Sequence, residues 1–212
     1  MNTRPSKIVC VGRSYAEHAQ ELGNAIPDSP VLFIKPPSSL ISLEDGITWN
    51  KNLGNLHHEC ELTLRLDQPL KNETDPQKAL EAIGAVTLGL DLTLRDLQDS
   101  LKKKGHPWER SKAFDGACVL ADWVEVSEVK AWNAVTFDFQ VNDQVRQKGD
   151  TALLLFSIAY LLCDISQAFS LEVGDVVMTG TPAGVAALQT GDQLCMTLQG
   201  KTQDYVWNTF VK

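Results

Sequence analysis

Two glutamates lie one pleat apart in the stretch LHHECELTLRL, residues 56–66. One register places Glu59 and Glu61 on a polar face, and the other register is apolar, with Cys60, Leu62, Leu64 and Leu66. This alternation is typical of a β-strand with one face in a core. Two carboxylates on one strand face can reach a single hard cation such as Mg²⁺ or Mn²⁺. A solvated polar face would give the same pattern, so the pair alone leaves both interpretations open.

Further residues could act with this pair. Asp91 ends the apolar run IGAVTLGLD, and strand ends commonly carry functional side chains, although a carboxylate there also suits the start of a helix. His18 and Glu21 are three residues apart on a predicted helix, a spacing that suits a general base with its orienting partner or a surface ion pair. Lys112 stands alone in ERSKAFD, and a lone lysine is most often exposed.

The turn TGTPAGV at 179–185 follows a predicted strand and carries two threonines. Such turns expose backbone N–H groups that can bind an anion, but most serve only as turns. Arg95 and Gln98 lie on a helix face distinct from its leucines, where solvation would also explain them. The pair His57 and His58 is not part of a helical H-E-x-x-H motif, so a zinc protease is not indicated.

Strands outnumber helices in the predicted order. We expect strands at 7–12, 31–35, 56–66, 83–92, 119–126, 135–141, 175–178, 193–199 and 205–211. We expect helices capped by Ser14, Asp75 and Thr93, and a longer one at about 151–168. Because the helices do not alternate regularly with the strands, the pattern favours a mostly-β α+β fold over a doubly wound sheet. No linker or repeat divides residues 1–212, which predicts a single domain.

Composition narrows the class of protein. The chain has 212 residues, 43% of them hydrophobic, and a net charge of −8, which allows a sizeable core and disfavours nucleic-acid binding. Its five cysteines are scattered and odd in number, which indicates a reducing compartment. The longest apolar run, 151–163, is too short to span a bilayer, and the first residues lack a signal sequence. We therefore expect a cytoplasmic protein with no membrane association.

Several blocks, taken together and in order, resemble the fumarylacetoacetate hydrolase family, in its short single-domain branch of acylpyruvate hydrolases and oxaloacetate enzymes. These blocks are CVGRSYAEHAQELGNAIPDSPVLFIKP, HHECEL, LDLTLRDLQ, KGHPWERSKAFD and LEVGDVVMTGTPAGV with a following GD. They cover nearly the whole chain. The resemblance implies a mixed β-sandwich roll that forms homodimers.

The resemblance also implies roles for individual residues. The family's metal ligands fall on Glu59, Glu61 and Asp91, which would bind Mg²⁺ or Mn²⁺. Its base pair falls on His18 and Glu21, and its active-site lysine falls on Lys112. The positions that resemble its substrate contacts are Arg13, Tyr15, Lys35, Arg95, Gln98 and Thr181.

The implied substrate is a small 2-oxo acid, whose carboxylate and keto oxygen can chelate a divalent ion. The leading hypothesis is a metal-dependent acylpyruvate hydrolase, which cleaves a C–C bond through a pyruvate enolate. The enzymatic alternatives are an oxaloacetate decarboxylase or keto–enol tautomerase, or a 2-hydroxyhepta-2,4-diene-1,7-dioate isomerase. A catalytically silent protein that binds a 2-oxo acid is the alternative outside enzymes.

The chain departs from the family pattern near its end. Gly-Val-Gly is usual there, whereas this sequence has Gly184-Val185-Ala186. If the third position needs a left-handed backbone, Ala186 would strain the turn. The metal and base positions are unaffected by this change.

Overall fold

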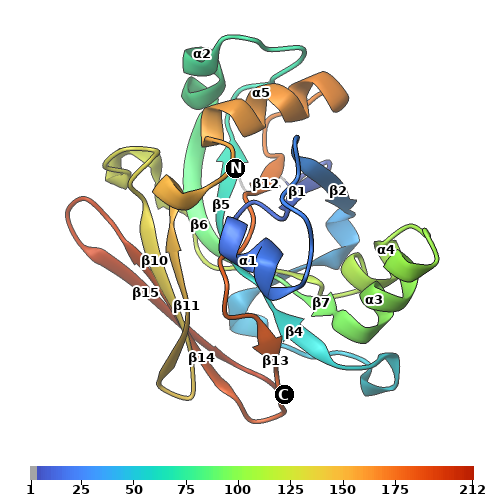
Figure 1. The fold of residues 1–212 in the computed structure, drawn as a ribbon. Helices are drawn as coiled ribbons and strands as arrows, with labels where there is room; N and C mark the ends of the chain where they lie inside the picture. The colour runs from blue at the N-terminus through green and yellow to red at the C-terminus, as the bar shows by residue number, and fades with distance from the viewer. Residues whose placement is uncertain (1–3) are drawn as a thin grey trace.

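Three sheets make up most of the structure, a computed structural model that describes residues 4–212 (Figure 1). The largest sheet is mixed, with strand order β2-β1-β12-β5-β6-β8-β3 and with β9 paired to β6. Its strands are β1 Ile8–Gly12, β2 Val31–Lys35, β3 Leu40–Ser42, β5 Cys60–Leu66, β6 Ile83–Asp91, β8 Cys118–Leu120, β9 Val124–Glu125 and β12 Val176–Met178. An antiparallel sheet has the order β11-β10-β14-β15, and a small one has the order β13-β4-β7. Their strands are β4 Leu56–His58, β7 Thr93–Leu94, β10 Thr136–Val141, β11 Gln144–Asp150, β13 Ala186–Ala187, β14 Gln193–Gln199 and β15 Asp204–Phe210.

Short helices flank these sheets instead of alternating with the strands (Figure 1). Helices α2 and α5 pack against each other, while α3 and α4 pack together beside β7. The α-helices are α1 Ala16–Glu21, α2 Pro76–Glu81, α3 Arg95–Lys103, α4 Glu109–Lys112 and α5 Ile158–Ala168. Short 3₁₀ turns occupy Pro37–Ser39, Leu43–Asp45, Lys51–Leu53, Val126–Glu128 and Thr151–Leu153. The predicted mostly-β α+β class is confirmed, while the extent of the domain over 1–212 stays a prediction.

The alternating stretch around Glu59 and Glu61 is buried on both faces. Its apolar face lies fully in the core, with Cys60, Leu62, Leu64 and Leu66 all 0% exposed. The polar face is also closed, since Glu59 is 5%, Glu61 2% and Thr63 0% exposed. A solvated polar face is therefore wrong, and the two carboxylates need partners within the protein.

The predicted strand 56–66 is interrupted at Glu59. Residues before it form β4, which pairs with β7 and β13, and residues after it form β5 in the large sheet. The carbonyl of Glu59 accepts a hydrogen bond from the Asp91 N–H at 2.8 Å, just where β6 ends. This bond continues the antiparallel register of β5 and β6, which pairs Cys60 with Leu90, so Glu59 lies beside Asp91 at the end of β6.

Helix α1 does not start as predicted. Tyr15 is its N-cap and makes no side-chain capping bond. The hydroxyl of Ser14 donates instead to the Val11 carbonyl at 3.3 Å, and the Ser14 carbonyl accepts from Leu155 N at 2.8 Å. Ser14 packs against Gly180, where a Cβ would lie 2.3 Å from the serine hydroxyl. Tertiary packing has therefore replaced the predicted capping box.

Two other helix starts also differ. Thr93 lies in β7 and donates its hydroxyl to the Asp91 carbonyl at 3.2 Å, so it does not cap α3. The helix predicted from residue 151 begins only at Ile158, after a 3₁₀ turn. Ser157 caps it by accepting a hydrogen bond from Tyr160 N at 3.3 Å. By contrast, Asp75 caps α2 as predicted, accepting from Gln77 N at 2.9 Å.

Several predicted strands agree with the structure in their boundaries. The strands expected at 31–35 and 193–199 match β2 and β14. The strand expected at 119–126 is instead divided into β8 and β9, and between them the Asp122 carbonyl accepts from the Thr87 hydroxyl at 2.9 Å. Strand β11 was not predicted, since its sequence QVRQKGD is mostly polar and lies at a sheet edge.

Asp175 fixes the first described residues against β12. Its carboxylate accepts hydrogen bonds from Ser6 N at 2.9 Å, Ser6 Oγ at 2.8 Å, Lys7 N at 3.1 Å and Glu172 N at 2.8 Å, and it pairs with the Lys7 ammonium. Burial alone would raise the pKa of Asp175, but these donors, Lys7 first, lower it below its ordinary value.

We expect Asp175→Asn to destabilise the fold by about 2–4 kcal/mol at pH 7, because an amide NH₂ would face several N–H donors. A depressed pKa stabilises the fold above the ordinary carboxyl value of about 3.9 and loses this effect as the pH falls through the folded-state pKa. Urea unfolding at several pH values should therefore show the difference from wild type shrinking in acid. Asp28→Asn, at an exposed position, is the control; an equal effect there would contradict the assignment.

Within residues 4–212, no helix has the length and apolar character that a membrane crossing needs.

Candidate active site and metal centre

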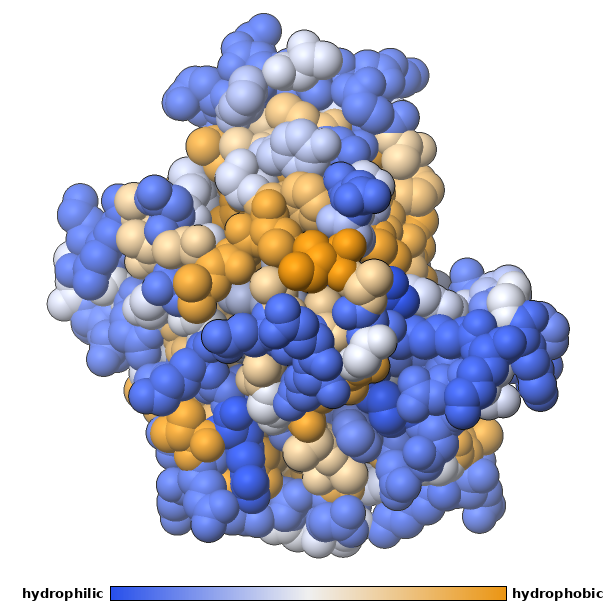
Figure 2. All heavy atoms as spheres, viewed as in Figure 1, coloured by the Kyte–Doolittle hydropathy of each residue, from blue (hydrophilic) through white to orange (hydrophobic). Residues whose placement is uncertain are grey.

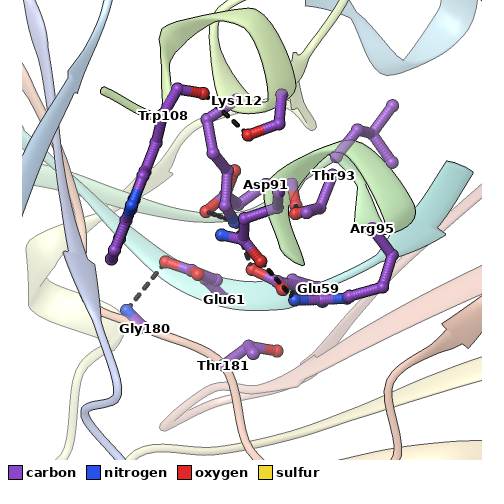
Figure 3. Close-up of polar contacts among 12 residues, drawn as sticks. Glu59, Glu61, Asp91, Thr93, Arg95, Trp108, Lys112, Gly180 and Thr181 are labelled. Atoms are coloured by element: carbon purple, nitrogen blue, oxygen red, sulfur yellow. Dashed lines mark hydrogen bonds and ion pairs between the residues drawn. The ribbon is translucent and has the colours of Figure 1, made fainter. Parts of the chain in front are cut away.

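Three carboxylates converge where β4, β5 and β6 meet (Figure 3). One oxygen atom from each of Glu59, Glu61 and Asp91 lies within 4.8 Å of the others, and all three residues are buried. The antiparallel register of β5 and β6 sets Glu61 opposite Gly89, two residues before Asp91. A Cβ at Gly89 would lie 2.8 Å from Thr63 Oγ1, so glycine leaves the space that this register requires. The three predicted metal ligands are therefore brought together.

Three buried cations surround two of these carboxylates. The Lys112 ammonium bridges Glu59 Oε2 at 2.6 Å and Asp91 Oδ2 at 2.7 Å. Lys35 Nζ lies 2.7 Å from Asp91 Oδ1, and the Arg95 guanidinium pairs with Glu59. Lys35 and Lys112 are linked in turn, because the Lys35 ammonium donates to the Lys112 carbonyl. The predicted active-site lysine thus lies inside the carboxylate cluster and not on the surface.

Glu61 differs from its two neighbours. Its carboxylate accepts a hydrogen bond from Gly180 N at 2.7 Å, and among residues 4–212 no lysine, arginine or histidine nitrogen lies within 4.0 Å of it. Burial, with the charges of Asp91 and Glu59, raises the pKa of Glu61 well above its ordinary value. A hard divalent cation would supply the missing positive charge, and a donor set of three carboxylates suits Mg²⁺ or Mn²⁺. The residues present therefore fit such an ion.

For Glu59 and Lys112, which pair with each other, the pKa shifts favour the charged forms, unlike that of Glu61. Burial would raise the pKa of Glu59, but Lys112 and Arg95 hold it well below its ordinary value. Burial would lower the pKa of Lys112, but Asp91 and Glu59 outweigh that effect and raise it. Lys112 is therefore an ammonium at neutral pH, and it is positioned to stabilise negative charge that forms beside it.

The turn after β12 presents two backbone N–H groups to carboxylates of the chain itself. Gly180 N binds Glu61, as described, and Gly184 N donates to the two carboxylate oxygens of Glu21 at 3.0 and 3.2 Å. The predicted anion-binding character of this turn is thus present. Ala186 follows in β13 and pairs with His58, outside the left-handed region of φ, so the expected strain is absent.

Thr181, a predicted substrate contact, has its hydroxyl occupied by the protein. It donates to the Cys60 carbonyl at 2.8 Å and accepts from Gln147 Nε2 at 2.7 Å. Gln147 Oε1 in turn accepts from Cys60 N at 3.0 Å and lies 3.0 Å from His58 Nδ1. Gln147 orders the backbone beside the carboxylates, and no sequence pattern indicates it because its strand β11 is mostly polar.

The predicted base pair is formed. His18 Nδ1 lies 3.4 Å from Glu21 Oε2, and Glu21 is held at its other side by the N–H of Gly184. His18 is buried, and burial lowers its pKa, with the charge of Glu59 acting in the opposite direction. The imidazole is therefore neutral at pH 7 and can accept a proton at Nε2.

The remaining predicted contacts lie around the same site. Arg95 donates to Gln98 Oε1 at 2.7 Å as well as to Glu59. Tyr15 has a buried hydroxyl and Arg13 a buried Nε, and neither atom has a hydrogen-bond partner among residues 4–212. Arg13 adopts a left-handed backbone with φ 57°. These unpartnered polar atoms suit contacts with a bound molecule.

Trp108 is a site residue that the sequence reasoning missed. Figure 3 shows its side chain on the opposite side of Lys112 from Arg95, extending toward Glu61. Its ring centroid is 5.9 Å from that of Phe33, over which Lys112 Nζ lies at 5.1 Å. These rings also border a hollow of about 520 Å³ that reaches Lys112. The motif around Lys112 contained this tryptophan, but nothing in the pattern assigned it to the site.

Comparison with known proteins supports the resemblance. Residues 7–206 match the fumarylacetoacetate (FAA) hydrolase C-terminal family. The chain is 42% identical to an oxaloacetate tautomerase of Escherichia coli (strain K12) over 92% of this chain and 89% of the relative. A candidate fumarylacetoacetate isomerase/hydrolase from Oleispira antarctica has a crystal structure with a TM-score of 0.93 at 44% identity, covering 98% of this chain and 94% of that one.

A second solved structure is that of fumarylpyruvate hydrolase from Pseudomonas aeruginosa in complex with Mn²⁺ and pyruvate. Its TM-score is 0.87 at 30% identity, over 97% of this chain and 90% of that one. The matched fold is the mixed, mostly-β type that the sequence predicted. Because the matches span nearly the whole chain and a buried carboxylate triad stands at the predicted positions, the protein belongs to the fumarylacetoacetate hydrolase family.

Proposed function

We propose that the protein is a divalent-metal-dependent oxaloacetate keto–enol tautomerase. The observation that carries the choice of reaction is the 42% identity, over 92% of the chain, with an oxaloacetate tautomerase. The buried triad with its bridging lysine supports the chemistry, because enolisation next to a carboxylate needs positive charge at the developing enolate. This reading replaces acylpyruvate hydrolysis as the leading hypothesis.

Glu59, Glu61 and Asp91 would hold Mg²⁺ or Mn²⁺, which supplies Lewis-acid polarisation of a 2-oxo acid when bound. The side chains of this chain would do the rest. Lys112 would place its ammonium against the C2 oxygen as that oxygen gains negative charge. Its position between two carboxylates keeps it protonated for this role.

His18 would move the proton. Ketonisation removes the proton from the C2 hydroxyl of the enol and adds one at C3. A neutral imidazole can take the hydroxyl proton at Nε2 and return it to C3, so that one base serves both steps. Glu21, fixed by the N–H of Gly184, would hold the ring at Nδ1 in the orientation for this transfer.

Acylpyruvate hydrolysis is the second candidate. The His18–Glu21 pair could equally activate water, and the fumarylpyruvate hydrolase from Pseudomonas aeruginosa shares the fold at 30% identity. Hydrolysis would add water to the acyl carbonyl and release pyruvate as its enolate, which Lys112 would stabilise in the same way.

The deciding experiment presents the purified protein with enol-oxaloacetate, acetylpyruvate and fumarylpyruvate, each with Mn²⁺ or Mg²⁺ and with a chelator. Loss of enol absorbance, C–C cleavage and CO₂ release are followed separately. Catalysed ketonisation as the fastest reaction is the expected result. Faster cleavage of an acylpyruvate would make hydrolysis the function, and metal-dependent binding without turnover would indicate a silent binding protein.

Replacing Lys112 by methionine should separate charge stabilisation from metal binding. We expect kcat/KM for ketonisation to fall roughly a hundredfold, the effect of losing a group that stabilises an oxyanion. Affinity for Mn²⁺ should rise, because Lys112 is a competing cation on Glu59 and Asp91. Calorimetric titration of Mn²⁺ checks this point. Lys103→Met, at an exposed position, is the matched control, and weaker Mn²⁺ binding in Lys112→Met would contradict the prediction.

The homodimer stays a prediction. Figure 2 shows apolar side chains gathered across the middle of one face, around the segment that joins β11 to α5 in Figure 1. Leu153 and Tyr160, in and after this segment, are 60% and 49% exposed. An apolar surface of this kind supports association with a second copy.

A further inference from the structure

One face of α3 carries three polar side chains in line. Arg95, Gln98 and Lys102 are spaced i, i+3 and i+7, which places them on one side of a helix. Arg95 at the inner end pairs with Glu59 and donates to Gln98. Lys102 stands seven residues further on, roughly 10 Å along the helix axis. The row therefore leads outward from the carboxylate triad.

The side chain of Lys102 is held by a contact with Trp108. Its ammonium lies 5.5 Å from the centroid of the Trp108 ring, a cation–π contact that holds the side chain toward this aromatic wall. Trp108 also lies against Gly12, since a Cβ built there would be 3.8 Å from its Cζ3. Lys102 is half-buried, whereas the adjacent Lys103 is exposed.

Arg13 completes a group of positive charges. It lies between Gly12, which meets Trp108, and Ser14, which packs against the Gly180 turn that binds Glu61. Among residues 4–212, neither Arg13 nor Lys102 has a carboxylate oxygen within 4.0 Å, and the Nε of Arg13 is buried without a partner.

The charges around Lys102 agree with this placement. Burial lowers the pKa of Lys102, and the nearby cations Arg95 and Arg13 lower it further, against smaller opposite effects of Asp99 and Glu59. Cations gathered beside one another without acidic partners favour the binding of an anion. The triad would take the 2-oxo acid end of a substrate, and Arg95, which pairs with Glu59, joins the triad to these cations along one face of α3.

We propose that Lys102, with Arg13 beside it, binds the second carboxylate of the substrate and makes the site selective for a 2-oxo dicarboxylate. Trp108 acts as a positioning residue for the lysine. The inference rests on the proposed function, because the proposed substrate, oxaloacetate, carries its second carboxylate at C4. It names a specificity determinant that the metal and base residues do not supply.

The test compares oxaloacetate with its 4-methyl ester, which keeps the 2-oxo acid and removes the distal charge. In Lys102→Met, KM for oxaloacetate should rise about ten- to a hundredfold, the effect of losing a charge-assisted hydrogen bond, with kcat little changed. KM for the ester should stay as in wild type. Lys102→Arg should retain the preference for oxaloacetate, and Lys103→Met should behave as wild type.

The proposal would be overturned if Lys102→Met changed KM equally for oxaloacetate and its 4-methyl ester. It would also be overturned if KM for oxaloacetate did not change. A binding measurement separates it from the proposed function. The probe is 3,3-difluoro-oxaloacetate, which has no C3 hydrogen and cannot enolise, titrated by calorimetry against the Mn²⁺-loaded protein. Suppose that wild type binds the probe, that Lys102→Met does not, and that wild type does not ketonise enol-oxaloacetate. The dicarboxylate site then stands and the proposed tautomerase function is wrong. If Lys102→Met binds the probe as wild type does, or wild type does not bind it, the dicarboxylate site is wrong.

Discussion

Replacing Glu61 by glutamine should abolish ketonisation and weaken Mn²⁺ binding by more than about a hundredfold, without loss of stability in the metal-free protein. The affinity falls because a direct ligand is lost, which costs more than the ten- to hundredfold effect of losing an outer partner. The fold keeps its stability because Glu61 has no cationic partner and stands beside two other carboxylates. A glutamine oxygen can still accept the Gly180 N–H.

Glu59→Gln is the matched variant, and its metal-free form should behave in the opposite way. It should also lose Mn²⁺, but with about 3 kcal/mol of destabilisation, because Lys112 and Arg95 are then left short of negative charge in a buried position. Asp91→Asn should likewise lose Mn²⁺ and destabilise the metal-free protein, because Asp91 pairs with Lys112 and Lys35. The three carboxylates are thus equivalent as ligands and unequal as structural groups.

Two measurements check these expectations: titration with Mn²⁺, and urea unfolding in the presence of a chelator. Wild-type Mn²⁺ affinity in Glu61→Gln would remove Glu61 from the metal site. Equal destabilisation of Glu59→Gln and Glu61→Gln would show that the buried ion pairs do not distinguish the two residues.

The sequence predicted a strand at 56–66 because its two faces differ in polarity, and it predicted Asp91 because an apolar run ends there. It could not show that the polar face is buried, since alternation alone is the same for a solvated sheet. Nor could it show that this stretch pairs antiparallel with the end of β6, which sets Glu59 beside Asp91. The family resemblance, and not periodicity, joined these residues into one site.

Local capping rules failed where tertiary contacts were stronger. Ser14 had the sequence of a capping box, but its place against Gly180 uses its hydroxyl and its carbonyl elsewhere. Gln147 is polar in a polar segment, and only the fold shows that it supports Thr181 and Cys60. Contacts between segments distant in sequence carry no local signal, so these features required the structure.

Replacing His18 by alanine should lower ketonisation of enol-oxaloacetate by roughly two to four orders of magnitude, the range for losing a positioned general base. Acylpyruvate cleavage, if present, should fall similarly, because it needs the same group to activate water. Decarboxylation of oxaloacetate should fall much less. Its C–C bond breaks without a proton transfer, and the charge left on the enolate is stabilised by Lys112, which the substitution does not touch.

Glu21→Gln should give a milder loss of ketonisation, because the amide can still orient the ring while the negative charge beside Nδ1 is removed. Part of this loss should come from a weaker contact between α1 and the turn after β12, since Glu21 also accepts the Gly184 N–H and joins the two. All rates should be compared at saturating Mn²⁺, so that a change in metal binding does not mimic a loss of the base. Equal losses of ketonisation and decarboxylation in His18→Ala would remove the proton-transfer role, because a residue that only positions the substrate would affect every reaction alike.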